Sequence, residues 1–297
     1  MGVLETAERE RRGLWLGLLG VVIFAMTLPM TRLAVGDIQD PQLPPFFVTA
    51  GRAAGAGVLS LLWLLAQRAA WPKREQLAAL GISAVGTVLG FPLFLALALR
   101  QAPAMHAAVV TGVLPLATAV MAALWLRQRP SFGFWLCASM GCGLVVAFAL
   151  REGGGITVAD LLLLGAVLSA AVGYVAGAHL AAQMGAERVI CWVLVLSLPL
   201  TLPASLLSWP AEPARASAWL GFGYVTLFSM WLGFFAWYRG LTWGGAVRVS
   251  QVQLLQPFLA LLFAVPVLGE PLEAATVGFS LAVMATVLVG RRMPIAS

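Results

Sequence analysis

Residues 98–115 read ALRQAPAMHAAVVTGVLP, and residues 240–257 read GLTWGGAVRVSQVQLLQP. Aligned with a constant offset of 142 residues, Ala98-Leu99 falls on Gly240-Leu241, Ala104 on Ala246, and Pro115 on Pro257. In each stretch the proline lies in the middle of a long apolar segment. The second half of the chain therefore repeats the first.

The composition is typical of a membrane protein. Hydrophobic residues make up 61% of the 297 residues and charged residues only 10%, whereas about 25% of the residues of a soluble domain are charged. The net charge of +6 does not indicate a nucleic-acid partner, because the basic residues stand at the ends of apolar segments, as membrane topology signals do.

A helix needs about 20 mostly apolar residues to cross the bilayer core, and the chain contains ten such segments. They run approximately 13–34, 44–66, 77–99, 103–126, 132–150, 159–182, 189–208, 217–238, 244–267 and 271–290. The predicted fold is an all-α polytopic membrane protein with a first five-helix repeat in residues 1–152 and a second in residues 156–297. The first apolar run is too long for the core of a signal peptide, which has about 7–15 residues, so we expect a retained helix.

The basic residues also predict the orientation. If the N-terminus is cytoplasmic, twelve basic residues fall at cytoplasmic ends: Arg9, Arg11, Arg12, Arg68, Lys73, Arg74, Arg127, Arg129, Arg188, Arg239, Arg291 and Arg292. The other side then carries four, namely Arg32, Arg100, Arg151 and Arg215. The positive-inside rule therefore places both termini in the cytoplasm. Because five spans are an odd number, the second repeat is inverted relative to the first, as in many transporters.

The sequence lacks the signatures of catalysis and of metal binding. It contains no HExxH, GxSxG or GxxxxGK[ST] motif, and its cysteines, Cys137, Cys142 and Cys191, form no CxxC pair. We therefore expect no cofactor, no metal and no enzymatic activity. Asp160 and Glu273 fall at the ends of predicted spans, so the usual buried carboxylate of a proton relay is not expected.

The ninth predicted segment is the most polar. Ser250, Gln253 and Pro257 share one helical face, and Gln251 lies on the neighbouring stripe. These side chains either line a cavity or form hydrogen bonds between helices. Pro115 and Pro257 each leave a backbone carbonyl without its helical partner and are expected to bend their helices.

Further cavity candidates are aromatic or titratable. Phe24, Phe91, Tyr174 and Trp237 either line the cavity or pack between helices, and His106 is either a structural group or a proton carrier. For two arginines the sequence likewise allows two alternative roles each. Arg52 either bonds structural carbonyls or faces a wet surface, and Arg248 either reaches the cytoplasmic interface or lines the pathway.

The five-plus-five arrangement, with a proline in the fourth and ninth segments, resembles the EamA family of the drug/metabolite transporter superfamily. The closest stretch is Tyr238-Arg-Gly-Leu241, followed by Gln256-Pro257 and Leu268-Gly-Glu-Pro271, which is similar to the family's Y-x-x-A-L, P and G-E-x pattern. The first half departs from that pattern, because Arg127-Gln-Arg-Pro130 stands where the G-E pair is usual.

Within that family the chain most resembles amino-acid exporters of the YddG type. The resemblance implies export of aromatic and other apolar amino acids and related metabolites across a bacterial inner membrane, by alternating access through a central cavity. It implies a small-molecule substrate and the lipid bilayer as partners, and a monomer. The alternatives are a different substrate, such as a drug or a nucleotide sugar, and, much less favoured, a membrane-embedded enzyme or scaffold.

Overall fold

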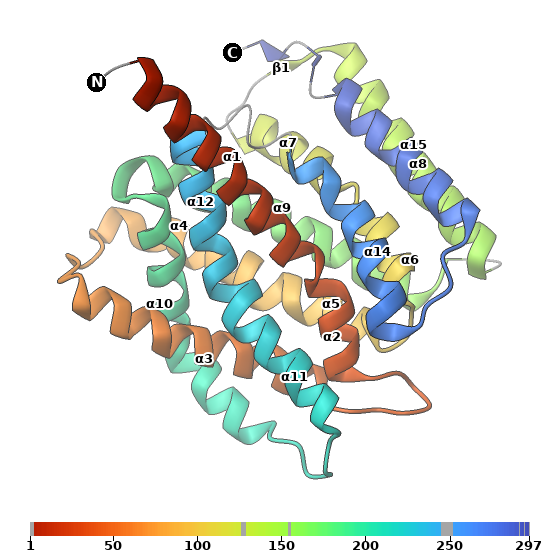
Figure 1. Ribbon diagram of the computed structural model, residues 1–297, viewed down its shortest axis with the longest axis horizontal. Coiled ribbons are helices and arrows are strands. Elements are labelled where there is room, and N and C mark those ends of the chain that lie inside the picture. The colour runs from red at the N-terminus through yellow and green to blue at the C-terminus, as the bar shows by residue number, and fades with distance from the viewer. Residues whose placement is uncertain are drawn as a thin grey trace.

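A computed structural model describes residues 3–125, 129–153, 156–244, 252–290, 292–293 and 295–296. Over those residues the protein is a bundle of packed helices (Figure 1). The elements of the first half are α1 (Val3–Ala25), α2 (Thr27–Val35), α3 (Pro45–Ala66), α4 (Arg74–Ser83), η1 (Ala84–Gly90), α5 (Phe91–Leu99), α6 (Ala104–Thr111), α7 (Leu114–Trp125), β1 (Arg129–Pro130) and α8 (Phe132–Gly153). Those of the second half are α9 (Val158–Met184), α10 (Ala186–Leu207), α11 (Ala216–Tyr224), η2 (Val225–Leu232), α12 (Gly233–Gly244), η3 (Gln253–Leu255), α14 (Gln256–Leu268), α15 (Ala274–Gly290) and β2 (Ile295–Ala296).

Eight helical stretches of the described chain are long and apolar enough to cross a membrane. Each overlaps one of the first eight predicted segments: Glu8–Val35, Pro45–Ala66, Arg74–Leu99, Ala104–Trp125, Phe132–Arg151, Val158–Ala181, Glu187–Leu207 and Ala216–Gly240. Two shorter apolar helices, Gln253–Leu268 and Ala274–Gly290, lie within the ninth and tenth predicted segments. Residues 245–251, near the start of the ninth, fall outside the described residues. The chain is thus a multi-pass membrane protein.

The two halves pack in matched pairs. The second span of one half, α3, lies along that of the other, α10, and the last spans, α8 and α15, pair likewise. The first span of each half lies against the third span of the other. In one case α1 packs on α12, and in the other α9 packs on α4, η1 and α5, which together form the third span of the first half. Exchanging the halves therefore reproduces the main contacts of the bundle.

Prolines divide two of the predicted spans. A proline has no N–H to donate to the carbonyl four residues earlier, so that carbonyl loses its helical partner. The carbonyl that Pro29 leaves unpaired in this way is that of Ala25, and for Pro115 it is that of Thr111. Ala25 is the last residue of α1 and Thr111 the last of α6. Pro257 is the second residue of α14 and follows the short 3-10 turn of η3.

Both halves also contain a π-helical segment in the third span. The segments are η1 in the first half and η2 in the second. With the same offset of 142 residues, residues 84–90 correspond to 226–232, which is η2 without its first residue. The repeat thus extends from the sequence pattern to a rare backbone geometry.

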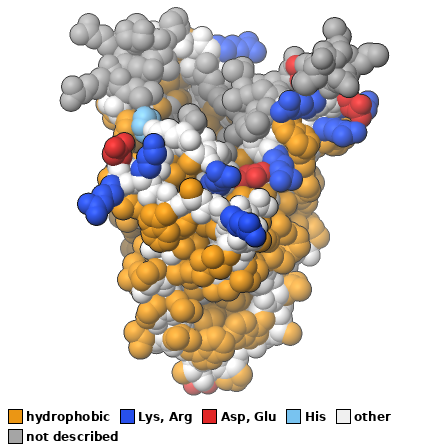
Figure 2. Space-filling model, turned by 90° about the vertical axis from the view of Figure 1, so that its left-hand side faces the viewer, with side chains coloured by type: hydrophobic (Ala, Val, Ile, Leu, Met, Phe, Trp, Pro, Cys, Tyr) orange, Lys and Arg blue, Asp and Glu red, His pale blue; other side chains and the backbone are white. Residues whose placement is uncertain are grey.

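The outer surface of the bundle is largely apolar. Large hydrophobic side chains such as Phe132 and Leu207 are 83% and 89% exposed, as expected where helices face lipid. On the face drawn in Figure 2, Lys and Arg side chains gather toward one end and hydrophobic side chains cover most of the remainder. That end is the one at which α1 begins and β2 lies (Figure 1).

The chain is not purely helical. β1 and β2 form an antiparallel pair that joins Arg129 to Ala296 and Pro130 to Ile295. Two-residue strands have no readable periodicity, so this contact between the C-terminal residues and the connection after α7 could not be predicted from the sequence.

Candidate functional site

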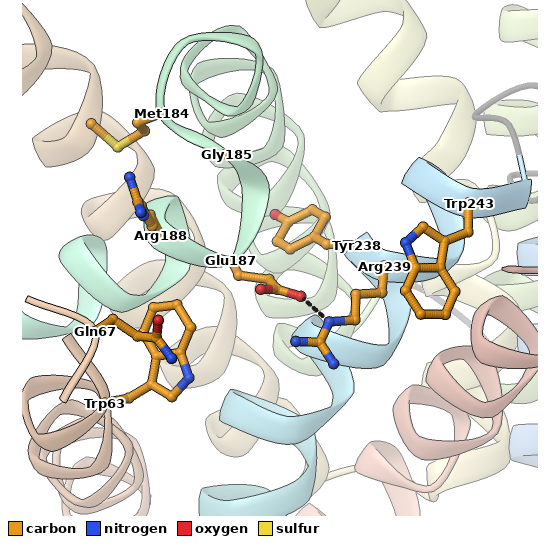
Figure 3. Close-up of a pocket in the computed structure, with 9 residues that line it drawn as sticks. All are labelled: Trp63, Gln67, Met184, Gly185, Glu187, Arg188, Tyr238, Arg239 and Trp243. Atoms are coloured by element: carbon orange, nitrogen blue, oxygen red, sulfur yellow. Dashed lines mark ion pairs between the residues drawn. The ribbon is translucent and has the colours of Figure 1, made fainter. Parts of the chain in front are cut away.

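A cavity of about 460 Å³ opens at the end of the bundle where the basic side chains gather (Figure 3). The ends of α3, α9, α10 and α12 surround it. Its lining residues are Trp63, Gln67, Met184, Gly185, Glu187, Arg188, Tyr238, Arg239 and Trp243. Gly185 joins α9 to α10 with a φ of +87°, a backbone conformation that other residues rarely adopt, and this turn brings Glu187 to the cavity wall.

The cavity combines aromatic surface with charges of both signs. Trp63, Tyr238 and Trp243 supply the aromatic surface. Glu187 and Arg239 point toward each other (Figure 3), with 2.7 Å between Glu187 Oε1 and Arg239 Nε. Arg188 is a second cation, so the described lining carries one positive charge in excess. Such a wall suits a small zwitterionic or anionic molecule with an apolar part.

A buried polar cluster lies deeper between the two halves. Arg52 on α3 is only 3% exposed. Its Nη2 donates to Ser229 Oγ on η2 at 3.0 Å, and Thr27 Oγ1 donates to the same oxygen at 2.8 Å. Tyr174 on α9 interacts electrostatically with Arg52 and also with Tyr238, which lines the cavity. Tyr174 is thus near both the buried guanidinium and a residue of the cavity lining.

Hydrogen bonds tie the opposite end of the bundle together. Arg100 donates to the carbonyls of Val35, Gln42 and Leu43, and Arg32 donates to the carbonyl of Leu99. Partial burial lowers the pKa of Arg100, which lies just beyond its span, but an arginine stays charged near neutral pH. These contacts join the ends of the first three spans.

Two carboxylates complete the contacts at this end. Asp160, near the start of α9, is 8% exposed, and its Oδ1 lies 2.7 Å from His106 Nε2 on α6. Glu270 accepts hydrogen bonds from the backbone N–H groups of Ala104 at 2.7 Å and Met105 at 2.8 Å, so it caps the start of α6. Glu270 belongs to the Gly-Glu pair noted in the sequence, and this cap is the structural role of that pair here.

We expect Glu270→Ala to destabilise the protein by about 2 kcal/mol, because two buried N–H donors lose a charged acceptor at a helix N-terminus. Thermal unfolding of the purified protein, followed by tryptophan fluorescence, measures the effect. Glu273→Ala is the matched control, since Glu273 is exposed three residues further on and its loss is expected to have little effect. Equal melting temperatures for the two variants would contradict the capping role.

Among the candidates predicted from the sequence, none of those that the structure describes lines the cavity of Figure 3. Phe24 packs edge-on against Phe234 with ring centroids 5.1 Å apart, and Phe91 packs against the core at the start of α5. Trp237 lies against Gly20 on α1. His106 lies at the end of the bundle opposite the cavity, where it pairs with Asp160.

The remaining candidates lie in two places. Tyr174 belongs to the buried cluster beside Arg52. Gln253 is half-buried at the start of η3. Ser250 and Gln251, like Arg248, lie outside the described residues, so the predicted polar face of the ninth segment remains a prediction.

Most residues of the cavity carried no distinctive signal in the sequence. Trp63 and Gln67 stand at the end of α3 and Glu187 at the start of α10, where aromatic and polar residues are common in any membrane protein. Tyr238 was visible as the first residue of the Y-x-x-A-L-like stretch. Thr27 and Ser229 are isolated hydroxyls within apolar runs, and only the packing of their helices brings them together.

A model of the EamA-like transporter family matches residues 11–149 and 157–291, once in each half. A Bacillus subtilis (strain 168) protein, called uncharacterized transporter YdeK, is 45% identical over 93% of this chain and 96% of its own length. An uncharacterized transporter of Archaeoglobus fulgidus is 26% identical over 91% of this chain and 98% of its own. A protein of known crystal structure aligns with a TM-score of 0.62 at 19% identity, over 93% of this chain and 95% of the other, and that likeness concerns the fold alone.

Proposed function

Because the chain belongs to the EamA-like transporter family, we propose that this membrane transporter exports aromatic and other apolar amino acids and related metabolites. Its family makes it a transporter rather than an enzyme. The observation that carries the substrate proposal is the cavity of Figure 3, which offers three aromatic side chains beside the Glu187–Arg239 ion pair. An amino acid has the matching features, namely an apolar side chain, an ammonium and a carboxylate.

The proposed mechanism is alternating access between two inverted halves. The cavity lies at the end of the bundle that is rich in Lys and Arg, whereas hydrogen bonds of Arg32, Arg100 and Glu270 hold the opposite end together. This arrangement corresponds to a state that is open toward the basic end. Rocking of the two halves would break these hydrogen bonds at one end of the bundle and close the cavity at the other end.

We further propose ten spans with both termini in the cytoplasm, in a bacterial inner membrane, and a monomer without a cofactor. The two shorter apolar helices, Gln253–Leu268 and Ala274–Gly290, would supply the ninth and tenth spans. Support for the orientation comes from the gathering of basic side chains at the end where α1 begins and β2 lies. By the positive-inside rule that end faces the cytoplasm.

Single cysteines introduced into a variant without Cys137, Cys142 and Cys191 test this orientation. We expect a cysteine at Glu212, which is exposed between α10 and α11, to react with a membrane-impermeant maleimide in intact cells. A cysteine at Arg74, at the start of α4, should react only after the membrane is permeabilised. The reverse pattern would place the termini outside, and labelling of both sites in intact cells would contradict the span count between them.

The transport proposal is tested with purified protein in liposomes. We expect labelled phenylalanine and leucine to exchange across these membranes faster than across protein-free liposomes. Trp63→Leu, which removes one aromatic wall of the cavity, is expected to reduce phenylalanine exchange about tenfold, because a buried aromatic contact contributes on the order of 1.5 kcal/mol. Trp15→Leu is the matched control, since Trp15 is 67% exposed and outside the cavity.

A panel of other labelled solutes distinguishes amino acids from the alternative substrates, a drug or a nucleotide sugar. If the liposomes exchange a drug or a nucleotide sugar but no amino acid, the family function stands and the amino-acid proposal falls. Exchange of amino acids at the protein-free rate would contradict the amino-acid proposal. Equal exchange rates for Trp63→Leu and Trp15→Leu would show that the cavity has no role in substrate binding.

A further inference from the structure

We propose that Arg52 forms an anion subsite in the interior of the protein, which receives the carboxylate of the transported molecule. The inference rests on the proposed transport function and specifies the substrate class: small amphipathic molecules that carry one carboxylate. The subsite consists of Arg52 with the hydroxyls of Ser229 and Thr27, and Tyr174 lies beside it.

Arg52 lies far from both ends of its span. It is the eighth residue of α3, about 10 Å along the helix from Pro45 and about 21 Å from Ala66 at 1.5 Å per residue. At 3% exposure its guanidinium has almost no contact with solvent or lipid. A buried charge at this depth is costly unless it has a partner, and such residues commonly mark substrate or ion pathways.

The hydrogen bonds of Arg52 leave most of its capacity unused. A guanidinium has five N–H donors. Nη2 bonds Ser229 Oγ and lies 3.8 Å from Met230 Sδ, a weak acceptor. Nε is fully buried and has no hydrogen-bond partner in the described structure. Among the described residues no carboxylate lies within ion-pair distance of Arg52, so its hydrogen-bond partners there are neutral groups and its charge has no described counter-charge.

A carboxylate would supply what this cluster lacks. It brings one negative charge and two acceptor oxygens in the planar geometry that a guanidinium binds in a bidentate manner. One carboxylate balances one guanidinium, whereas a doubly charged phosphate would leave a buried negative charge without a described partner. The subsite therefore favours carboxylates over phosphate esters and over cations.

The subsite shares helix α3 with part of the cavity lining and contains residues of both halves of the chain. Arg52 and Trp63 are eleven residues apart on α3, about three turns, so they lie on the same face of that helix about 16 Å apart along its axis. Tyr174 interacts electrostatically with Arg52 and with Tyr238, which lines the cavity. Because Arg52 and Thr27 belong to the first half and Tyr174 and Ser229 to the second, a carboxylate bound here would contact both moving parts.

Four probes of one skeleton test the inference on the wild-type protein: phenylalanine, phenylpyruvate, phenylalaninamide and phenethylamine. The first two carry a carboxylate and the last two do not. In detergent, we expect phenylalanine and phenylpyruvate to raise the melting temperature at concentrations at least tenfold lower than the amide and the amine require. In liposomes, the unlabelled carboxylates should compete with labelled phenylalanine at least tenfold more strongly.

Arg52→Gln tests the residue itself. We expect it to abolish the preference for phenylalanine over phenylalaninamide, while Arg52→Lys keeps the preference with weaker binding, because lysine retains the charge without the bidentate geometry. Arg74→Gln is the control for loss of one positive charge, since Arg74 is exposed at the start of α4. A merely structural Arg52 would lower the melting temperature of Arg52→Gln but leave the ratio of acid to amide unchanged.

The outcomes separate the two proposals. If wild-type protein exchanges amino acids but binds acid and amide equally, the Arg52 inference is overturned and the transport proposal stands. If it exchanges no amino acid, the transport proposal fails, while selective stabilisation by phenylpyruvate in detergent still supports the subsite. If Arg52→Gln does not fold, Arg52→Lys decides: weaker binding of phenylalanine with unchanged binding of phenylalaninamide supports the subsite, and wild-type affinity for both probes overturns it.

Discussion

Gly86→Val is expected to prevent most of the protein from folding. A Cβ atom at Gly86 would lie 2.4 Å from the carbonyl oxygen of Ser169 and 2.7 Å from Gly173 Cα, both on α9. Both are backbone atoms, so no change of side-chain rotamer can relieve the overlap. The valine would therefore force η1 away from α9, at a cost of about 3 kcal/mol or more by the standard of overpacked cores. Close contact at small residues is a principal source of helix association in lipid.

The control for this prediction lies five residues earlier in the same span. A Cβ at Gly81 meets no atom within 4 Å, so Gly81→Val should fold as the wild-type protein does. The measurement is the monodisperse fraction after size-exclusion chromatography in detergent, with the melting temperature of whatever is recovered. A normal yield and melting temperature for Gly86→Val would show that η1 and α9 can separate without loss of stability.

Asp160→Ala is expected to cost about 3 kcal/mol, the upper range measured when a buried hydrogen-bonding group loses its partner. The carboxylate has three described partners at the joint between α6 and α9. Its Oδ1 pairs with His106, and its Oδ2 accepts from the backbone N–H of Thr157 at 2.8 Å and from the Thr157 hydroxyl at 2.7 Å. Loss of the carboxylate removes the N-terminal cap of α9 and the contact to α6 together.

Two further variants isolate these contributions in thermal unfolding. Asp160→Asn keeps an acceptor for the cap but loses the negative charge, so we expect an intermediate melting temperature. Arg215→Gln breaks the exposed Arg215–Asp40 ion pair of 2.7 Å, and exposed pairs contribute about 0–1 kcal/mol. If Asp160→Ala melts no lower than Arg215→Gln, the buried pair does not stabilise the joint.

The positions of the spans followed from the sequence because length and apolar content determine them. The fifth segment, predicted at 132–150, is α8, which begins at Phe132 and ends at Gly153. The interruptions within spans were harder to predict. Pro115 and Pro257 stood out through the repeat, but Pro29 did not, and η1 contains no residue type that demands a π turn. Such a turn depends on what packs beside it, and α9 lies against η1.

The polar interior was only partly predictable, since its contacts join distant parts of the chain. The sequence allows two interpretations of Arg52, because its partner Ser229 is 177 residues away. The sequence places Asp160 at the polar end of a span. It is buried because α6 begins beside it and places His106 against the carboxylate, across 54 residues of sequence. Spacing within one helix carries no information about either contact.

The matching π segments bear on the history of the chain. π turns are rare, and η1 and η2 occupy equivalent positions although Ala84–Gly90 and Val225–Leu232 have little sequence in common. The simplest explanation of a π segment at the same position in both halves is inheritance from one ancestral half, which had this segment before it was duplicated. That ancestral half then kept the shape of its third span in both copies, while Ser229, in the second copy alone, became the contact of Arg52.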